Sequence, residues 1–465
     1  MGYDSFLLLA QQADAAAGLS LSNFIPFSIL HFLEFAIWGA WYVVLGNYLN
    51  ALGFSRPSIG RIYGTMAIGA IISPMILGTV ADKYLNTEVV IGLSHLTGGI
   101  LLIVMSQMRK PGAFFAAALA YALVYSPTLT LVNSIYFEHA NADYFPYVRV
   151  FGTIGWILAG LSLKLLLKPD RPVDNTPLLL AATLSFILGV FAFLLPDTPP
   201  KATEAGALPF LQAIGMLAEP SSAVFFGVTL VIAMAMGIYF AFAALFIEQR
   251  AGVKSQNVGP IMTIGQAVEI FFMLSLPWFI REVGMPVVLT VGVTAWALRF
   301  AFFTAASTGK YFPLVLAGVA LHGLCFDFYF AAGFIHVEKL SDPSIRASAQ
   351  ALFGVVVYGL GMYLGTEGGG WLNQYFTREK PASVEDVVGA ALVDDPSVTR
   401  TTDWRSFWLI PCIAVSISLA AFLASLVLIP QPGPDEAAPA VAGDDGGATV
   451  EEDPAPAADV PAESP

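Results

Sequence analysis

A single arginine lies near the start of the strongly apolar stretch FPYVRVFGTIGWILAG. If this stretch is a helix, Thr153 at i+4 and Trp156 at i+7 share one face with Arg149. Gly152 and Gly155 lie between them and allow the backbone of another helix to come close. A cation at membrane depth is costly, so it is normally buried against a partner or a polar cavity. A guanidinium, a hydroxyl and an aromatic ring on one face make Arg149, Thr153 and Trp156 our first candidates for binding a small polar molecule.

Several other polar or ionisable side chains also stand inside apolar runs. Gln266 and Glu269 lie at i, i+3 in TIGQAVEIFF, so they share a helix face. His322, Phe326 and Asp327 lie together in LHGLCFDFYF. Burial of a carboxyl group favours its neutral form, which a group that exchanges protons near neutral pH needs. Glu269 and Asp327 are therefore candidate proton carriers as well as candidate binding residues.

Isolated charges in other apolar runs include Glu34 in HFLEFAIWGAW and Arg299 in WALRFAFF. These residues also have a plainer, structural interpretation. An acid near a span end, such as Glu34 or Glu367, can lie among lipid headgroups, and Arg299 can pair with Asp327 of the following run. His95 is more typical of a histidine that packs between helices. The sequence leaves these alternatives open.

The composition of the chain is unlike that of a soluble protein. Its 465 residues are 57% hydrophobic and only 12% charged, which no soluble globular chain of this length matches. Both cysteines lie in apolar runs and exclude a disulfide framework. The 21 Lys and Arg residues form no basic cluster, which argues against a nucleic-acid partner. The sequence has no nucleophile–base set, phosphate-binding loop or metal-ligand spacing, so we expect neither an enzyme nor a cofactor or metal site.

Apolar runs of membrane-spanning length follow one another along the chain, and we count about twelve. Their approximate spans are 26–51, 57–80, 88–107, 111–136, 147–168, 177–195, 222–247, 257–280, 285–307, 312–337, 347–374 and 405–429. The Pro-, Ala- and Thr-rich stretch DTPPKATEAGALP separates the first six from the last six. We therefore predict an all-α polytopic membrane protein with twelve transmembrane helices in two six-helix halves.

The expected organisation has five parts. They are a lead-in at 1–24, a first six-helix half at 25–196, a cytoplasmic linker at 197–221, a second half at 222–430 and an acidic tail at 431–465. The lead-in lacks a signal-peptide pattern. The tail is rich in Pro, Ala and acidic residues and has no aromatic residue, so we expect it to be disordered. A long polar loop at about 375–404 is expected between the last two spans.

Seven stretches carry a resemblance and keep their order along the chain: FLEFAIWGAWYVVLGNYL, IGRIYGTMAIGAIISPMILGTVADKYL, SPTLTLVNSIYF, PYVRVFGTIGWILAG, WALRFAFF, CFDFYFAAGFIHVEK and PSIRASAQALF. Over roughly residues 28–428 the chain resembles the nucleoside:proton symporter family of the major facilitator superfamily. The resemblance implies a multi-pass protein of the plasma (inner) membrane. It also implies that the protein imports nucleosides together with protons by alternating access and works as a monomer in the lipid bilayer.

The orientation in the membrane is contested by two signals. The count of Lys and Arg in short loops places both termini outside under the positive-inside rule. The stretch LGTVADKYL, however, resembles the superfamily's motif between the second and third helices, with Gly78 for close packing and Asp82 for a charge contact across the cytoplasmic gate. That motif implies cytoplasmic termini, and this is the orientation we expect.

The family's motifs imply which residues line the substrate site. They fall on Arg149, Thr153, Trp156, Gln266, Glu269, Phe326 and Asp327. His322 stands where the family has a tyrosine, and Tyr239 is the one mid-span polar group of the seventh helix, where the family has amides. The proton would be carried by Asp327 or Glu269, with Glu34 as a further candidate.

Two other functions remain compatible with the sequence. The same machinery could carry another hydroxylated small molecule, such as an oligosaccharide, because the arginine–glycine pattern R-x-x-G-x-x-G is widely shared. The departure in the seventh helix keeps this alternative open. A protein on a transporter fold can also act as a non-transporting membrane sensor, because fold alone does not prove activity.

Overall fold

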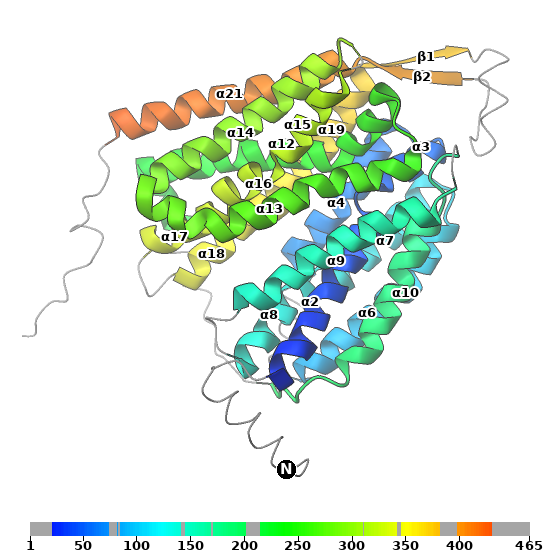
Figure 1. The fold of residues 1–465 in the computed structure, drawn as a ribbon, viewed down its shortest axis with the longest axis vertical. Helices are drawn as coiled ribbons and strands as arrows, with labels where there is room; N and C mark the ends of the chain where they lie inside the picture. Colours follow the sequence, from blue (N-terminus) through cyan, green and yellow to red (C-terminus); the bar gives the residue numbers. More distant parts are fainter. Residues whose placement is uncertain are drawn as a thin grey trace, which may run out of the picture. The chain divides into compact units, whose positions relative to one another are not determined.

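The computed structural model describes residues 21–73, 81, 84–140, 145–168, 171–200, 214–309, 311–341, 346–381 and 398–429. The predicted gate residues Gly78 and Asp82, most of the lead-in, part of the linker and the acidic tail lie outside these ranges. Helices make up nearly all of the described chain (Figure 1). The helices before residue 200 are α2 (Leu21–Trp41), α3 (Leu45–Ala51), α4 (Arg56–Ser73), α6 (Thr87–Gln107), α7 (Pro111–Tyr125), α8 (Thr128–His139), α9 (Phe145–Leu166) and α10 (Thr176–Ala192).

The second part of the chain continues with helices and ends in a hairpin and one further helix. Its elements are η3 (Met216–Ala218), α12 (Pro220–Ala251), α13 (Ser255–Val283), α14 (Met285–Ala306), α15 (Phe312–Ala320), α16 (His322–Cys325), η4 (Phe326–Ala331), α17 (Ala332–Leu340), α18 (Arg346–Gly354), η5 (Val355–Gly361), α19 (Met362–Tyr375), β1 (Thr377–Pro381), β2 (Val398–Thr402) and α21 (Trp404–Leu428). The elements η4 and η5 are π-helical turns inside longer helices. Such turns are rare and frequently occur at functional sites.

The described helices confirm a polytopic membrane protein. Nine of them, or continuous pairs of them, are long and apolar enough to cross a bilayer, and a tenth span arises if the bent pair Phe312–Ala320 and His322–Leu340 is one crossing. The two remaining predicted spans coincide with α4, which adjoins the undescribed residues 74–80, and with α10, which is shorter at 17 residues. The helix positions thus follow the apolar runs of the sequence.

The helices pack as two groups that follow chain order. Among the early helices, α2 packs against α9 and α10, α6 against α7 and α10, and α4 against α7. Among the later ones, α12 packs against α19 and α21, and α14 against α15 and α21. Figure 1 shows the blue-to-cyan early helices lying alongside one another and the green-to-orange later helices doing the same. The pairs α9–α13 and α4–α19 join the two groups.

Several of these joining contacts involve α3, the first turns of α4 and the last turns of α12. A Cβ atom on Gly60 of α4 would stand 2.1 Å from the carbonyl oxygen of Thr366 in α19, so these two backbones touch. The next residues of the two helices, Arg61 and Glu367, form a 2.9 Å ion pair. The Nδ2 group of Asn47 donates to the carbonyl of Ala244 at 3.3 Å. Glu367 therefore pairs with an arginine of the other group of helices, and its position at headgroup level stays a prediction.

The predicted polar loop at 375–404 contains two short strands. Its two ends form an antiparallel pair of strands, β1 and β2, with Thr377 opposite Thr402 and Pro381 opposite Val398. The strand residue Arg400 donates from Nη1 to the carbonyl oxygen of Gly53, at the turn between α3 and α4, at 3.1 Å. The hairpin therefore ties the second group of helices to the first at the same end as the Arg61–Glu367 pair.

The two glycines predicted to allow close helix packing, Gly152 and Gly155 of α9, contact the neighbouring helix α2. A Cβ atom on Gly155 would lie 2.1 Å from the carbonyl oxygen of Phe32, and one on Gly152 would lie 2.7 Å from the ring of Phe35. Only glycine permits this approach, which brings α2 directly onto the helix that carries Arg149.

We expect Gly155→Ala to lower the stability of the folded protein. The added methyl group must displace backbone atoms, and overpacking of this kind typically costs about 1–3 kcal/mol. Gly227→Ala in α12 is the matched control, because nothing lies within 4 Å of its Cβ position. Thermal unfolding of both variants in detergent measures the effect. Equal midpoints for the two variants would show that α2 and α9 are not packed as closely as described.

Candidate substrate site

Arg149 sits on α9 against an aromatic ring of α2. Its guanidinium carbon lies 3.9 Å from the centroid of the Phe35 ring, in the geometry of a cation–π interaction. Its Nη1 atom is buried and has no hydrogen-bond partner within the described part of the chain. The ring lowers the cost of the buried charge, while the free donor is available to a ligand.

Glu269 and His322 meet where two helices touch. The Nε2 atom of His322 on α16 lies 3.4 Å from Oε2 of Glu269 on α13. Glycines make this possible, because a Cβ atom on Gly323 would lie 2.8 Å from the Cα atom of Glu269 and one on Gly265 would lie 2.7 Å from the Cβ atom of His322. Gln266, one turn before Glu269, is 6% exposed and its Oε1 atom has no partner among the described residues. The predicted Gln–Glu pair and His322 therefore belong to one site.

Asp327 lies on the π-helical turn η4 and is wholly buried. Neither of its carboxyl oxygens has a hydrogen-bond partner among the residues that the structure describes. It lies within range of electrostatic interaction with Glu269 and Arg149. Arg149 in turn interacts with both acids and with Tyr358 of η5. Ionisable residues of α9, α13 and the two π-helical turns thus lie within electrostatic range of one another.

Arg299 does not form the ion pair with Asp327 that the sequence allowed. Its Nε atom donates to the carbonyl oxygen of Gly318 at 3.0 Å, and its guanidinium lies over the rings of Tyr239 and Trp296. The two residues lie on consecutive apolar runs, which made the pair possible from sequence. In the structure the Arg299 side chain contacts Gly318, Tyr239 and Trp296 instead. Asp327 is left without a basic partner in contact.

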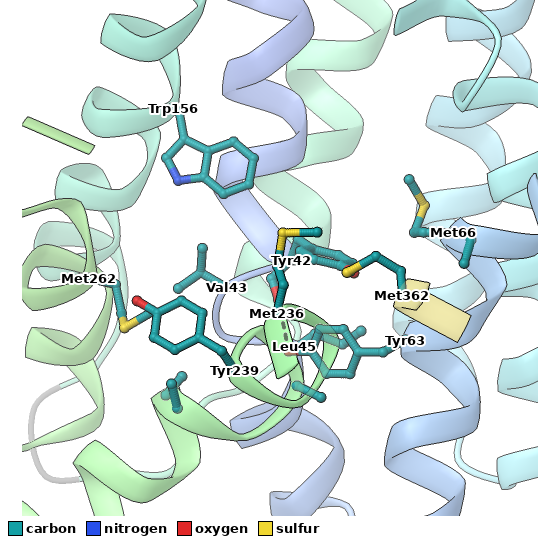
Figure 2. Close-up of a cluster of buried hydrophobic side chains, with 14 of the residues drawn as sticks. Tyr42, Val43, Leu45, Tyr63, Met66, Trp156, Met236, Tyr239, Met262 and Met362 are labelled. Carbon is teal, nitrogen blue, oxygen red and sulfur yellow. Dashed lines mark hydrogen bonds between the residues drawn. The ribbon is translucent and has the colours of Figure 1, made fainter. Parts of the chain in front are cut away.

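Aromatic rings line the same region. His322 stacks on Tyr239 with a centroid distance of 6.1 Å and on Phe326 at 5.8 Å. Trp156 is 8% exposed and meets Trp38 edge to face at 5.4 Å. Figure 2 shows Trp156 and Tyr239 in one cluster of buried side chains that also includes Met236, Met262 and Met362. Thr153 on α9 is 6% exposed.

Glu34 belongs to a different network inside the first group of helices. It is wholly buried, which rules out a position among headgroups. Its Oε2 atom lies 2.8 Å from Nε2 of His95, and its Oε1 atom accepts from the Thr128 hydroxyl at 2.7 Å. Tyr125 donates its hydroxyl hydrogen to the Glu34 carbonyl at 2.8 Å, and Ser185 lies 3.4 Å from the other ring nitrogen of His95. The packing histidine predicted from sequence is therefore the partner of the isolated acid.

The sequence did not point to two residues that belong to this region. Phe35 carries no signal, because its role depends on α2 packing onto the glycine strip of α9. Tyr358 lies in the run VVVYGLG and interacts electrostatically with Arg149, Glu269 and Asp327. A lone tyrosine among apolar residues was the available signal for it. Within the described ranges, no group of three or more His, Cys, Asp or Glu could hold a metal ion.

A family model described as nucleoside H+ symporter matches residues 22–429. The chain belongs to the nucleoside H+ symporter family. The family description names a symporter, and together with the apolar helices this makes the protein a multi-pass membrane transporter.

The relatives agree with this membership. The putative nucleoside transporter YegT of Escherichia coli is 35% identical over 85% of this chain and 92% of its own length. The xanthosine permease of Escherichia coli is 32% identical over 82% of this chain and 90% of its own length. A crystal structure of the nucleoside transporter NupG superposes with a TM-score of 0.74 at 29% identity, over 87% of this chain and 99% of NupG.

We expect Glu34→Gln to destabilise this family member strongly. The amide cannot offer two acceptor oxygens to His95 and Thr128 as a carboxylate does, and a buried polar group left without its hydrogen bond typically costs about 1–3 kcal/mol. The control is Glu282→Gln, because Glu282 pairs with Arg281 at 3.0 Å on the exposed surface, where ion pairs contribute little. Thermal unfolding and the yield of folded protein measure both. Unchanged stability of Glu34→Gln would show that the network is not structural.

Proposed function

We propose that this protein imports nucleosides by proton symport, with two six-helix halves alternating access to a site formed by Arg149, Glu269 and Asp327. The observation that carries the proposal is Asp327, a wholly buried carboxyl group with no hydrogen-bond partner among the described residues and with Arg149 and Glu269 within electrostatic range. A charged carboxylate in such surroundings is costly, and taking up a proton removes that cost. Asp327 is therefore the residue to which we assign the proton.

The unpartnered polar atoms around Asp327 fit a hydroxylated ligand with a flat ring. The described residues leave Arg149 Nη1, Gln266 Oε1, His322 Nδ1 and the Tyr239 hydroxyl without partners. These atoms include donors and acceptors, as ribose hydroxyls and base edges require. Trp156 and Phe326 offer rings on which a base would stack, and Thr153 offers a further hydroxyl. A flat base explains the aromatic content better than an oligosaccharide does.

The names of relatives support the same substrate class. YegT is named as a putative nucleoside transporter and NupG as a nucleoside permease. Xanthosine, which the third relative is named for, is itself a nucleoside. We propose that Tyr239 takes the place of the amides that the family uses in its seventh helix and that His322 takes the place of the family's tyrosine. The site then recognises nucleosides with a hydroxyl and an imidazole in their place.

Three groups were candidates for the proton, and their surroundings rank them. Glu269 already contacts His322, so its carboxyl group has a polar partner. Glu34 has partners at both carboxyl oxygens and lies in the separate network with His95. Neither carboxyl oxygen of Asp327 has a hydrogen-bond partner among the described residues. We therefore give the coupling role to Asp327, with Glu269 as the group that binds substrate and responds to it.

The contacts at one end support alternating access. The Arg61–Glu367 pair, the Asn47–Ala244 bond and the close approach of Gly60 to Thr366 join the two groups of helices there. We propose that this end is closed in the present conformation and opens when the halves rock about the site. We further propose a monomer with cytoplasmic termini, as the resemblance of LGTVADKYL to the superfamily motif with Gly78 and Asp82 implies.

The uptake of radiolabelled uridine and adenosine into cells without their own nucleoside carriers tests the proposal. We expect uptake to rise at low external pH and to collapse with a protonophore. Unlabelled maltose should not compete, whereas competition by sugars but not by nucleosides would favour the oligosaccharide alternative. Absence of any uptake from a well-expressed protein would contradict the proposal.

Asp327→Asn should abolish concentrative uptake and leave counterflow exchange measurable, because the amide resembles a permanently neutral carboxyl group. The matched control is Asp403→Asn, which removes a carboxylate outside the span. Asp403 caps α21 by accepting from the Ser406 amide at 3.2 Å, and asparagine caps helices equally well. Loss of both uptake and exchange in folded Asp327→Asn would instead assign this residue a structural role.

A further inference from the structure

Arg299 is a buried cation that neither the ion pair predicted for it nor the proposed mechanism explains. It is wholly buried on α14, and its Nη1 and Nη2 atoms have no hydrogen-bond partner among the described residues. Nε donates to the carbonyl oxygen of Gly318 on α15 at 3.0 Å. A leucine or methionine would fill this space without the cost of burying a charge. The interactions that offset this cost therefore indicate what the residue does.

Two aromatic faces take the place of an acid beside this guanidinium. Its carbon lies 4.3 Å from the ring centroid of Tyr239 on α12 and 4.7 Å from that of Trp296 on its own helix. Cation–π interactions are strongest where water is excluded, as it is here. Tyr239 is 1% exposed. The ring of Phe303 also lies nearly parallel to it, with a distance of 6.2 Å between the ring centroids. The tyrosine ring is thus fixed in position by a charge and by packing.

The fixed ring leads to the substrate site. Tyr239 stacks on the imidazole of His322 with an angle of 26° between the rings, and His322 stacks on Phe326 at 21°. The Nε2 atom of the same imidazole lies 3.4 Å from the Glu269 carboxylate. A continuous series of contacts therefore runs from Arg299 through Tyr239 and His322 to Glu269. It crosses four helical elements, α14, α12, α16 and α13.

We propose that Arg299 is a positioning residue of the substrate site, which holds the Tyr239 ring so that His322 keeps its contact with Glu269. The proposal rests on the proposed function, because it concerns the affinity of that site. Arg299 does not contact the substrate itself. Its guanidinium holds the Tyr239 ring by a cation–π interaction, and the Tyr239 ring in turn orients the imidazole of His322 by stacking on it.

The first test is the affinity for a nucleoside after loss of the guanidinium. Arg299→Met keeps the length of the side chain and should raise the KM for uridine uptake about tenfold, while Vmax per folded transporter changes less than about twofold. Arg299→Lys keeps a cation over the ring but loses the planar fork, so we expect a rise in KM of about threefold. A residue that only supported folding would lower the amount of folded protein and leave KM unchanged.

A double-mutant cycle tests whether Arg299 acts through Tyr239. If it does, Arg299→Met should add little to the KM of Tyr239→Leu, because the ring that it positions is already gone. The two effects would multiply if the residues acted independently, and that result would overturn the proposal. If Arg299→Met does not accumulate as folded protein, the same cycle is run with Arg299→Lys.

The matched control is Arg250→Met. The Nε atom of Arg250 also donates to a backbone carbonyl, that of Ser307, at 3.0 Å. Its loss should lower thermal stability without a change in KM. An equal KM for Arg299→Met and Arg250→Met, with normal uptake by the wild type, would refute the positioning role alone. Absence of uptake by the wild type would instead refute the proposed function, so the two failures are distinguishable.

Discussion

The cost of placing an ionised group inside an apolar bundle of helices shapes most of what is specific about this protein. The described structure meets that cost in three ways. Arg149 and Arg299 lie over aromatic rings, Glu34 is enclosed by His95 and a hydroxyl, and Glu269 contacts His322. Each solution fixes at least one neighbouring side chain in position. The buried charges therefore organise the aromatic residues around them, in addition to any chemistry that they perform.

Asp327 is the exception to these arrangements, and its difference has a physical meaning. The acid at Glu34 has partners at both carboxyl oxygens, whereas Asp327 has none among the described residues. A group with satisfied partners gains little from a change of protonation, but a group without them depends on its proton to remain buried. In our proposal these two acids therefore have different roles, Glu34 a structural one and Asp327 one in the transport cycle.

Close backbone contact is the second requirement of the site. Gly155 brings α2 against α9, so that Phe35 can lie under Arg149, and Gly323 brings α16 against α13, so that His322 can reach Glu269. The π-helical turns η4 and η5 then change the direction of the side chains that follow. Such turns add a residue to the helix repeat and re-aim the side chains of Asp327 and Tyr358. The geometry therefore depends on backbone features as much as on the ionisable groups.

The sequence predicted the spans well, because a bilayer requires long apolar runs and irregular backbone at membrane depth is costly. It also singled out Arg149, Glu269 and Asp327 as candidates, since any ionisable residue in such a run needs a reason to be there, and the structure places the three within electrostatic range of one another. It could not identify partners. Helical spacing defines which residues share a face, but it does not determine which helix that face meets. The Arg299–Asp327 pair was wrong for this reason, and the Glu34–His95 pair was missed although both residues had been noticed.

The asymmetry between the two acids of the site bears on how a proton and a nucleoside could be coupled. Coupling requires that proton and substrate favour the same conformational step. Glu269 and Asp327 interact with each other and with Arg149, so a change at one alters the electrostatic field at the other. In our proposal a proton on Asp327 removes one of two negative charges, which leaves Arg149 and Glu269 to bind the ligand. A site with both acids charged would hold an excess of negative charge in apolar surroundings, and in our proposal this cost opposes movement of a carrier that has bound the nucleoside but not the proton.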